Sequence, residues 1–373
     1  MIFHRNQTEQ IDDLLNRIGE KLQLNKPMQC LVAEKYDEVY KVLEKNNDFK
    51  YSGNVYPQGS YALQTTVKPL GSDDFDLDVV IQFDEFWSSE LSPTEVINSV
   101  VSGLADTYTD LKPKNRCVRI NFKDFHLDVV PAFPYNKDNM EKIKVPNVET
   151  DNWKISCPKG YISWFEEKCR FKEIILEMSE RFDITQEKLT EQVPYEIKPP
   201  LKIAVQLAKR FRDVYFENKQ NKSTPSIIIT TLFADSYDGS ASAYETIDNI
   251  LLKICDKIQK TKGIMEIRNP ANNVEVISEC WSDNLSNYMA FCEYIKEFAK
   301  RWEALSKASG IKETQTILES MFKENIASQV ITEQAKFIAD MREKDNLMIS
   351  SKGTISKFGD GTVAIKKNNF FGE

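Results

Sequence analysis

Carboxylates gather in one short stretch of the chain, residues 71–83, which reads GSDDFDLDVVIQF. Side chains of a strand alternate between two faces, so the apolar residues of this stretch would face a core while Asp74, Asp76 and Asp78 lie opposite them. Like charges on one face repel, and the stretch holds no basic residue. Mg²⁺ would offset that repulsion because it favours carboxylate oxygens. By itself, the stretch is equally consistent with a solvated strand edge.

A second strand pattern supplies a third carboxylate. Residues 125–130, FHLDVV, place Asp128 on the face opposite the apolar residues. If the two strands are neighbours, Asp128 faces Asp76 and Asp78, and three such carboxylates hold two metal ions about 4 Å apart to align an attacking hydroxyl with a leaving phosphate oxygen. We therefore predict that Asp76, Asp78 and Asp128 are catalytic metal ligands. His126 is expected to be a packed neighbour, because Mg²⁺ prefers oxygen.

A glycine and a serine upstream could bind phosphate. Gly59 and Ser60 lie in QGSYALQTTVKPL, between a short predicted strand and the start of a helix. Glycine allows backbone N–H groups to approach phosphate oxygens closely, and the serine hydroxyl adds a donor. A Gly-Ser pair is also common in ordinary turns. Phosphate binding is favoured here by the order of motifs: Gly-Ser, then Asp-x-Asp on a strand, then a lone Asp on a later strand.

The spacing of apolar residues predicts helices in some parts of the chain and strands in others, and these elements must position the candidate residues. The first fifty residues are helical in period, and residues 51–134 mix strands with helices. Residues 132–158 are polar and interrupted by prolines, which predicts a long surface connection. Beyond this connection, amphipathic helical patterns predominate, at residues 159–182, 199–217, 241–261, 283–308 and 311–342.

These patterns predict an α+β protein in which a core with a mixed sheet packs against an α-helical domain, with a cleft between them. We expect the core and its N-terminal helices at residues 1–198 and the α-helical domain at 199–345. A flexible C-terminal tail is expected at 346–373, because four of the 13 glycines lie in its last 21 residues.

Composition excludes several chemistries. The 373 residues include 49 Lys and Arg against 57 Asp and Glu, for a net charge of −8. Two histidines are too few for a Cys₂His₂ finger, an H-E-x-x-H zinc protease or a multi-histidine iron or copper site. Seven scattered cysteines form no C-x-x-C motif, which suits reduced thiols. The acidic balance argues against a general binder of duplex DNA or anionic membranes. With no apolar run of membrane-spanning length and no signal-peptide pattern, we expect a cytoplasmic protein.

The chain resembles a known family at this set of motifs. The order Gly-Ser, Asp-x-Asp and lone Asp is the signature of polymerase-β-like nucleotidyltransferases. Within that superfamily, QGSYALQTTVKPL and DDFDLDVVI are similar to the bacterial cGAS/DncV-like nucleotidyltransferases (CD-NTases, SMODS type) of CBASS anti-phage signalling. The likeness continues through VQLAKRFRDVYF, TPSIIITTLFADSY and NPANNVEVISECW, and so covers roughly residues 30–300.

The resemblance implies a fold, a reaction and further site residues. The core would be a polymerase-β-like nucleotidyltransferase core, which uses two Mg²⁺ ions, or Mn²⁺ in their place, to join NTPs into a cyclic di- or trinucleotide second messenger. Lys209 and Ser226 would contact nucleotide phosphates. Alternatively, Lys209 is an ordinary lysine on a solvated helix face, and Lys202 takes its place in the site. The alternative for Ser226 is a plain helix-cap serine. We expect Thr224 to cap a helix at Ser226, although β propensity favours a strand over the following residues.

Partners follow from the same resemblance. The substrates would be NTPs, ATP among them, and the product would activate a separate effector protein during phage infection. In some systems of this family the enzyme is conjugated to another protein through its C-terminus; residues 369–373, NFFGE, end in Glu and leave conjugation open. Two alternatives remain: a transferase acting on tRNA or on a small-molecule acceptor, and a non-catalytic nucleotide-binding scaffold.

Arg116 and Arg119 flank a predicted strand and could line a nucleotide pocket, but nothing in the sequence decides this. The segment with Asn269, Pro270 and Trp281 matches the family's Asn-Pro…Trp pattern, and we interpret it as structural: a turn and a buried indole.

Overall fold

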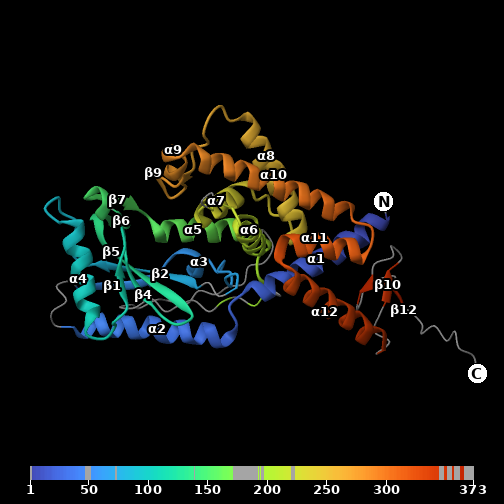
Figure 1. The fold of residues 1–373 in the computed structure, drawn as a ribbon, viewed down its shortest axis with the longest axis horizontal. Coiled ribbons are helices and arrows are strands. Elements are labelled where there is room, and N and C mark those ends of the chain that lie inside the picture. Colours follow the sequence, from blue (N-terminus) through green and yellow to red (C-terminus); the bar gives the residue numbers. More distant parts are fainter. Residues whose placement is uncertain are drawn as a thin grey trace, which may run out of the picture.

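The structure is a computed structural model with two lobes, a sheet lobe at one end and a helical lobe at the other (Figure 1). It describes residues 2–46, 52–71, 74–137, 139–170, 192, 194, 197–219, 223–343, 348–350, 355–356 and 362–364. Here the sheet lobe means residues 26–156, and the helical lobe means α1 (Ile2–Leu22) together with residues 158–343.

The sheet lobe is built on a seven-stranded mixed sheet. Its main path runs β1 (Gly53–Pro57), β2 (Phe75–Phe83), β5 (Phe125–Asn136), β4 (Val118–Asn121) and β3 (Leu111–Pro113). Two further strands, β6 (Asn139–Asn147) and β7 (Asn152–Ser156), extend from β5. Strands β2 and β5 run parallel, and every other pair in this sheet is antiparallel. The predicted mixed sheet is confirmed.

Strand alternation gives this sheet one apolar face. Leu77, Val79 and Ile81 of β2 are almost fully buried in a core shared with α2 (Lys26–Lys45) and α4 (Pro93–Ala105). Helix α4 starts after Ser92, whose side chain accepts a hydrogen bond from the Glu95 N–H. With helices covering this face, the aspartates of β2 point to the opposite face of the sheet.

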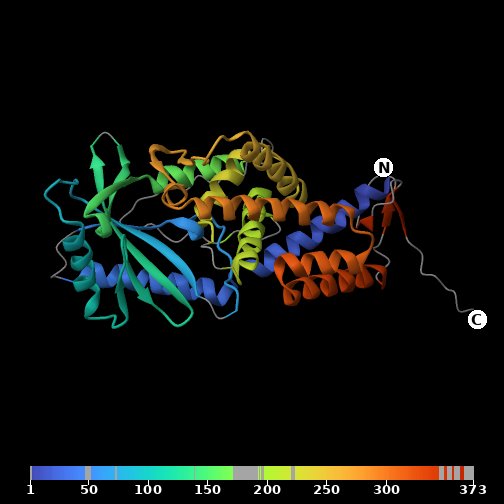
Figure 2. The same cartoon turned by 45° about the horizontal axis from the view of Figure 1, so that its top comes forward.

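The helical lobe surrounds α6 (Pro200–Phe216), which is buried along most of its length. Around it lie α5 (Pro158–Cys169), α7 (Ser226–Ser236), α8 (Ala243–Lys260), α9 (Glu279–Asp283), α10 (Leu285–Lys307), α11 (Ile311–Phe322) and α12 (Glu324–Glu343). Figure 2 shows α10 running along the lobe above α1. The core is rich in aromatic residues: Phe211 of α6 packs against Tyr294 and Phe298 of α10. Ile228, Ile229 and Phe233 of α7 are buried in the same core, which explains why α7 is helical despite its β-branched residues: tertiary contacts outweigh propensity.

Three expectations about the elements differ from the structure. The predicted connection at 132–158 is wrong, because β5 continues to Asn136 and β6 and β7 follow. Pro134 lies within the paired part of β5, so prolines that suggested a loop sit within strands instead. The predicted helix at 311–342 is divided at Lys323, whose φ of 78° ends α11. The helix predicted at 159–182 ends at Cys169 in α5, and residues 171–182 lie outside the described residues.

The ends of the chain are placed as follows. Helix α1 contributes Leu14, Leu15 and Ile18 to the core of the helical lobe, whereas α2 contributes to the core of the sheet lobe. Packing therefore separates the two N-terminal helices, and the domain boundary at residue 198 stays a prediction. In the predicted tail, β10 (Met348–Ser350) pairs with β11 (Ile355–Ser356) and β12 (Thr362–Ala364). Its other residues, 369–373 among them, are outside the described part of the chain.

Residues 64–68, here called the strap, follow the Gly-Ser motif and lie against α6. Polar side chains from α6, and from Lys198 two residues before it, hydrogen-bond to backbone carbonyls of the strap: Lys198 to Gln64, Lys209 to Thr65, Gln206 to Thr66 and Arg210 to Lys68. Burial together with the Lys202 charge lowers the pKa of Lys198 to about 7. Because buried carbonyls need donors, these contacts hold the two lobes in one arrangement.

We predict that Gln206→Met lowers the free energy of unfolding by about 1–3 kcal/mol, because the buried Thr66 carbonyl loses its donor at 2.8 Å. Urea unfolding followed by circular dichroism measures the change. The matched control is Gln259→Met on an exposed position of α8, which should leave the unfolding midpoint nearly unchanged. Equal midpoints for the two variants would contradict this role of Gln206.

Candidate active site

One large cleft, with a volume of about 940 Å³, opens between the two lobes. Its walls come from β2, the short α3 (Gly59–Ala62), the strap and the residues after it, α5 to α7, and the hairpin of β8 (Arg268–Asn269) and β9 (Asn272–Val276). Six of the seven predicted site residues line it: Gly59, Ser60, Asp76, Asp78, Lys209 and Ser226. The seventh, Asp128, lies behind the cleft surface.

The parallel pairing of β2 and β5 brings the carboxylates together. Its register sets Asp78 beside Asp128 and Asp76 beside His126. Neighbouring parallel strands lie about 4.8 Å apart, so side chains on the same face are in direct contact range. The two aspartates of the Asp-x-Asp motif and the lone Asp128 therefore lie on one face of the sheet, as the sequence predicts.

A cation from the next strand balances these charges. Arg119 of β4 donates two hydrogen bonds of 2.7 Å to the two oxygens of Asp128, and its guanidinium lies 2.9 Å from Asp76. The bidentate geometry is the strongest form of this ion pair, and the hydrogen bonds to Asp128 raise the pKa of Arg119. The sequence left open whether Arg116 and Arg119 line a nucleotide pocket. Neither lines the cleft, and Arg119 pairs with Asp128 and Asp76 instead. The acidic stretch itself gave no sign of Arg119, because Arg119 lies on β4 and only the folded sheet brings β4 beside β5.

Asp78 lines the cleft between the Gly-Ser motif and Asp128. Burial raises its pKa to about 7, and the charges of Asp128 and Asp76 act in the same direction. A Cβ atom added at Gly59 would lie 2.4 Å from Asp78 Oδ2, and Gly59 has a φ of +63°. Glycine is therefore required there twice over, for its backbone conformation and for the space that the carboxylate occupies.

The donor set fits a hard divalent cation. Carboxylate oxygens are the ligands that Mg²⁺ prefers, and the raised pKa of Asp78 signals a charge that a cation would stabilise. Among the described residues, no three His, Cys, Asp or Glu side chains already converge as a metal cluster. The Arg119 guanidinium binds the oxygens of Asp128 and contacts Asp76.

The Gly-Ser motif is tied to both lobes. The Gln58 N–H donates to the Asp78 carbonyl at 2.8 Å, so the motif starts directly beside β2. The Ser60 and Thr66 hydroxyls share a hydrogen bond of 3.2 Å. Because Gln206 binds the Thr66 carbonyl, the helical lobe orients Ser60 through the strap.

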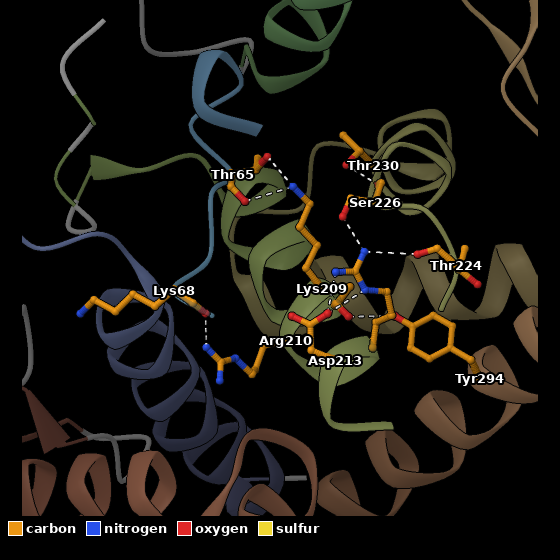
Figure 3. Close-up of polar contacts among 11 residues, drawn as sticks. Thr65, Lys68, Lys209, Arg210, Asp213, Thr224, Ser226, Thr230 and Tyr294 are labelled. Carbon is orange, nitrogen blue, oxygen red and sulfur yellow. Dashed lines mark hydrogen bonds and ion pairs between the residues drawn. The ribbon is translucent and has the colours of Figure 1, made fainter. Parts of the chain in front are cut away.

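Lys209 lies where α6 meets the strap. Its amine donates to the carbonyl and the hydroxyl of Thr65, at 3.1 and 3.0 Å, and Figure 3 shows the side chain extended toward that residue. Burial lowers the pKa of Lys209 to about 7, and the nearby Arg212 charge adds to this shift. Lys202, the alternative, turns away from the cleft to an ion pair with Glu166 at 2.7 Å.

Ser226 is the first residue of α7, on the side of Lys209 opposite Thr65 (Figure 3). Its hydroxyl accepts a hydrogen bond from Arg212, which also donates to the Thr224 carbonyl at 3.2 Å. The predicted Thr224 cap is wrong: Pro225 is the N-cap residue, and the Thr224 hydroxyl is buried with no partner among the described residues. Arg212 lines the cleft and was missed, because one arginine on a charged helix gives no signal in the sequence.

A second polar group lies on another wall of the cleft. Ser156, Asn269 and Glu275 line it at the junction of β7 with the β8–β9 hairpin. The interpretation of this segment as structural is confirmed for Trp281, which is fully buried. It is incomplete for Asn269, whose amide reaches a carboxylate on the cleft wall.

Taken together, the mixed sheet, Asp-x-Asp on one strand, the third Asp on its parallel neighbour and the facing Gly-Ser motif define a nucleotidyltransferase of the polymerase-β-like class. Comparisons with known proteins agree. Residues 9–169 match the model of the Second Messenger Oligonucleotide or Dinucleotide Synthetase domain. A c-di-GMP synthase of Roseivirga ehrenbergii is 32% identical over 383 residues, covering all of both chains.

The cyclic dinucleotide synthase CdnG of Bradyrhizobium diazoefficiens is 20% identical over 86% of this chain and 82% of its own. The structure of the CD-NTase CdnG from the same organism in complex with GTP superposes with a TM-score of 0.70. That match has 19% identity and covers 86% of this chain and 97% of the other. This chain therefore belongs to the cGAS/DncV-like nucleotidyltransferases, the CD-NTases, and is an enzyme. No helix in the described part of the chain has the length and apolar character to cross a membrane.

We predict that Gly59→Ala lowers the rate of nucleotide joining by about 100-fold, because a displacement of about 1 Å at a reacting centre has that effect. The added Cβ would push Asp78 from its position. The matched control is Gly71→Ala, which has the same φ of +63° and nothing within 4 Å. Both variants carry the same backbone strain, so equal loss of activity in both would contradict the contact with Asp78. Pyrophosphate release measures the rate.

Proposed function

We propose that this enzyme joins two GTP molecules, with release of two pyrophosphates, into cyclic di-GMP. The observation that carries the nucleotidyl transfer is the register of β2 and β5, which sets Asp76, Asp78 and Asp128 on one face beside the cleft. The choice of GTP is supported by the full-length relative named as a c-di-GMP synthase. In each step a ribose hydroxyl oxygen bonds to the α-phosphorus, the bond to the pyrophosphate oxygen breaks, and the hydroxyl proton leaves to a carboxylate or water.

Asp76, Asp78 and Asp128 are proposed to hold two Mg²⁺ ions, with Mn²⁺ as a substitute. The bound metal supplies charge stabilisation at the phosphate oxygens and lowers the pKa of the attacking hydroxyl. Asp128 must exchange its bond with Arg119 for this role, and Arg119 is then free to neutralise Asp76 or a phosphate. Arg119 bridges Asp128 and Asp76, which offsets part of the repulsion among the carboxylates.

Four residues are proposed to bind the triphosphate: Gly59, Ser60, Lys209 and Ser226. The first two meet Asp78 at one end of the cleft, and the other two stand on α6 and α7 across from them. Arg212 adds a second cation beside Ser226. A triphosphate entering between them would replace the Thr65 carbonyl as the partner of Lys209, because a phosphate oxygen forms the stronger, charge-assisted bond.

The cellular setting is proposed from the family. The cyclic product would act in the cytoplasm on a separate effector protein during phage infection, and conjugation through residues 369–373 stays a prediction. The alternative acceptors, tRNA or a small molecule, are less well supported, because both curated relatives are named as cyclic dinucleotide synthases. A non-catalytic scaffold is disfavoured because all three carboxylates are in register.

We predict that Asp76→Asn combined with Asp78→Asn lowers formation of the cyclic product by more than about 100-fold. Changing a residue that only orients a metal ligand costs up to about 100-fold in activity, and loss of two ligands should cost more. Incubation with GTP and Mg²⁺, phosphatase treatment and mass spectrometry identify the product. Asp84→Asn is the matched control, since Asp84 is exposed just beyond β2 and accepts a hydrogen bond from Ser52. Wild-type levels of product from the double variant would overturn the metal assignment.

We predict that nucleotide binding adds a proton to Lys209. The pKa of this buried amine is lowered to about 7, so at pH 8 it is mostly neutral in the free enzyme. A phosphate nearby raises the pKa, and the amine then takes up as much as about one proton at pH 8 but almost none below pH 6, where it is already charged.

Calorimetric titrations with a non-hydrolysable GTP analogue, in buffers of different ionisation enthalpy, measure this uptake. Lys209→Met is the reference, because protons gained or lost by the nucleotide itself cancel in the difference from wild type. The same proton uptake in both proteins at pH 8 would rule out Lys209 as the group that changes its charge.

A further inference from the structure

The polar group on the second wall of the cleft is built around one carboxylate. Glu275 of β9 accepts a hydrogen bond from the Asn269 amide on Oε2, at 2.8 Å, and from the Ser156 hydroxyl on Oε1, at 3.3 Å. Asn269 is itself oriented, since its Oδ1 accepts from the Ala271 N–H at 2.9 Å. The amide nitrogen must therefore face Glu275, and the plane of the carboxylate is held from both sides.

This carboxylate lacks a counter-ion. No lysine or arginine nitrogen of the described residues lies within 4.0 Å of Glu275, although its burial raises its pKa. The charged group that acts most strongly on Glu275 is Arg116, which does not line the cleft. A buried carboxylate is costly unless it is paired or fully hydrogen-bonded. The Asn272 side chain also acts on the pKa of Glu275, but it forms no hydrogen bond to another described residue. Two oxygens offer about four lone-pair sites, so donors on Asn269 and Ser156 leave sites on both oxygens for a ligand.

The ligand must bring two donors side by side. A purine nucleotide whose triphosphate lies at Lys209 and Ser226 has its base elsewhere in the same cleft, and Glu275 lines that cleft. Guanine presents the N1–H and N2–H donors in parallel on its Watson–Crick edge, which matches two carboxylate oxygens. Adenine presents one donor and the N1 lone pair, which a carboxylate repels.

We propose that Glu275, held by Asn269 and Ser156, reads the Watson–Crick edge of guanine in one bound GTP and so sets the base preference of this enzyme. The inference rests on the proposed synthesis of a cyclic dinucleotide and deepens it by naming the residue that selects the base. It assigns a ligand to the half-buried carboxylate on this wall and gives Asn269 and Ser156 positioning roles.

The test compares GTP, ITP and ATP as single substrates, with kcat/KM taken from pyrophosphate release. ITP keeps N1–H and lacks the N2 amino group, so it separates the two donors. We expect the wild type to favour GTP over ITP and over ATP by about 10-fold or more, the discrimination typical of a bidentate contact. Glu275→Gln should reduce both preferences to within about 3-fold, because the new amide loses one acceptor and offers a donor to adenine N1.

Controls separate this proposal from other outcomes. Glu279→Gln, the same change on α9 at a residue paired with Lys154 instead of the cleft, should keep the wild-type preferences. An equal fall for all three nucleotides in Glu275→Gln would indicate a ribose contact or a structural role and would overturn the proposal, as would unchanged preferences. If that variant fails to fold, Glu275→Asp replaces it: the shortened carboxylate should lower kcat/KM for GTP more than for ATP, and a loss by the same factor for both nucleotides overturns the proposal.

Failure of the proposed function looks different. A wild-type enzyme that releases no pyrophosphate from GTP, or whose products remain sensitive to phosphatase, contradicts cyclic dinucleotide synthesis without reference to Glu275. A wild-type enzyme that makes cyclic product from GTP and ATP equally well contradicts only the base-reading role.

Discussion

The site depends on the mutual repulsion of three carboxylates that the fold forces onto one face of the sheet. Asp78 and Asp128 are adjacent in the register of β2 and β5, and Asp76 is two residues away. Burial and like charge together raise the pKa of Asp78 to about 7. The protein limits this cost with Arg119, which binds both oxygens of Asp128 and reaches Asp76. Such a site is ready for cations and for the phosphates that accompany them, because each cation that enters relieves charge that the fold has already concentrated.

A second constraint joins the lobes. Buried side chains at one face of α6 supply hydrogen-bond donors to the strap, so the position of Ser60 beside Asp78 depends on residues more than 130 positions further along the chain. The same helix presents Lys209 and Arg212 to the cleft. The proposed phosphate contacts and the arrangement of the lobes are therefore linked through one helix, whose buried polar side chains have no solvent to compensate them if the strap moves.

Much of this could be predicted from the sequence. The alternation of residues in β2 and β5 determines which aspartates share a face, because the period of a strand is two. The helical periods placed α6, α8 and α10 within a few residues of their observed bounds. The strands β6 and β7 could not be predicted, since their polar and proline residues are typical of loops and only pairing with β5 makes them strands. A related reason explains why the sequence left the role of Arg119 open and gave no sign of Arg212 or Glu275. Each is one ordinary charged residue until the fold places it at the site.

The sequence by itself determined the chemistry: an acidic, histidine-poor chain with Gly-Ser, Asp-x-Asp and a lone Asp in the order of a nucleotidyltransferase. It did so because residue types and strand alternation are local properties. Tertiary structure decided which charges meet. Only the pairing of β4 with β5 brings Arg119 to Asp128. Only the packing of the β8–β9 hairpin against β7 places donors around Glu275 without an ion pair among the described residues. Electrostatic energy depends on distance and burial, and both are set by contacts between residues far apart in the chain.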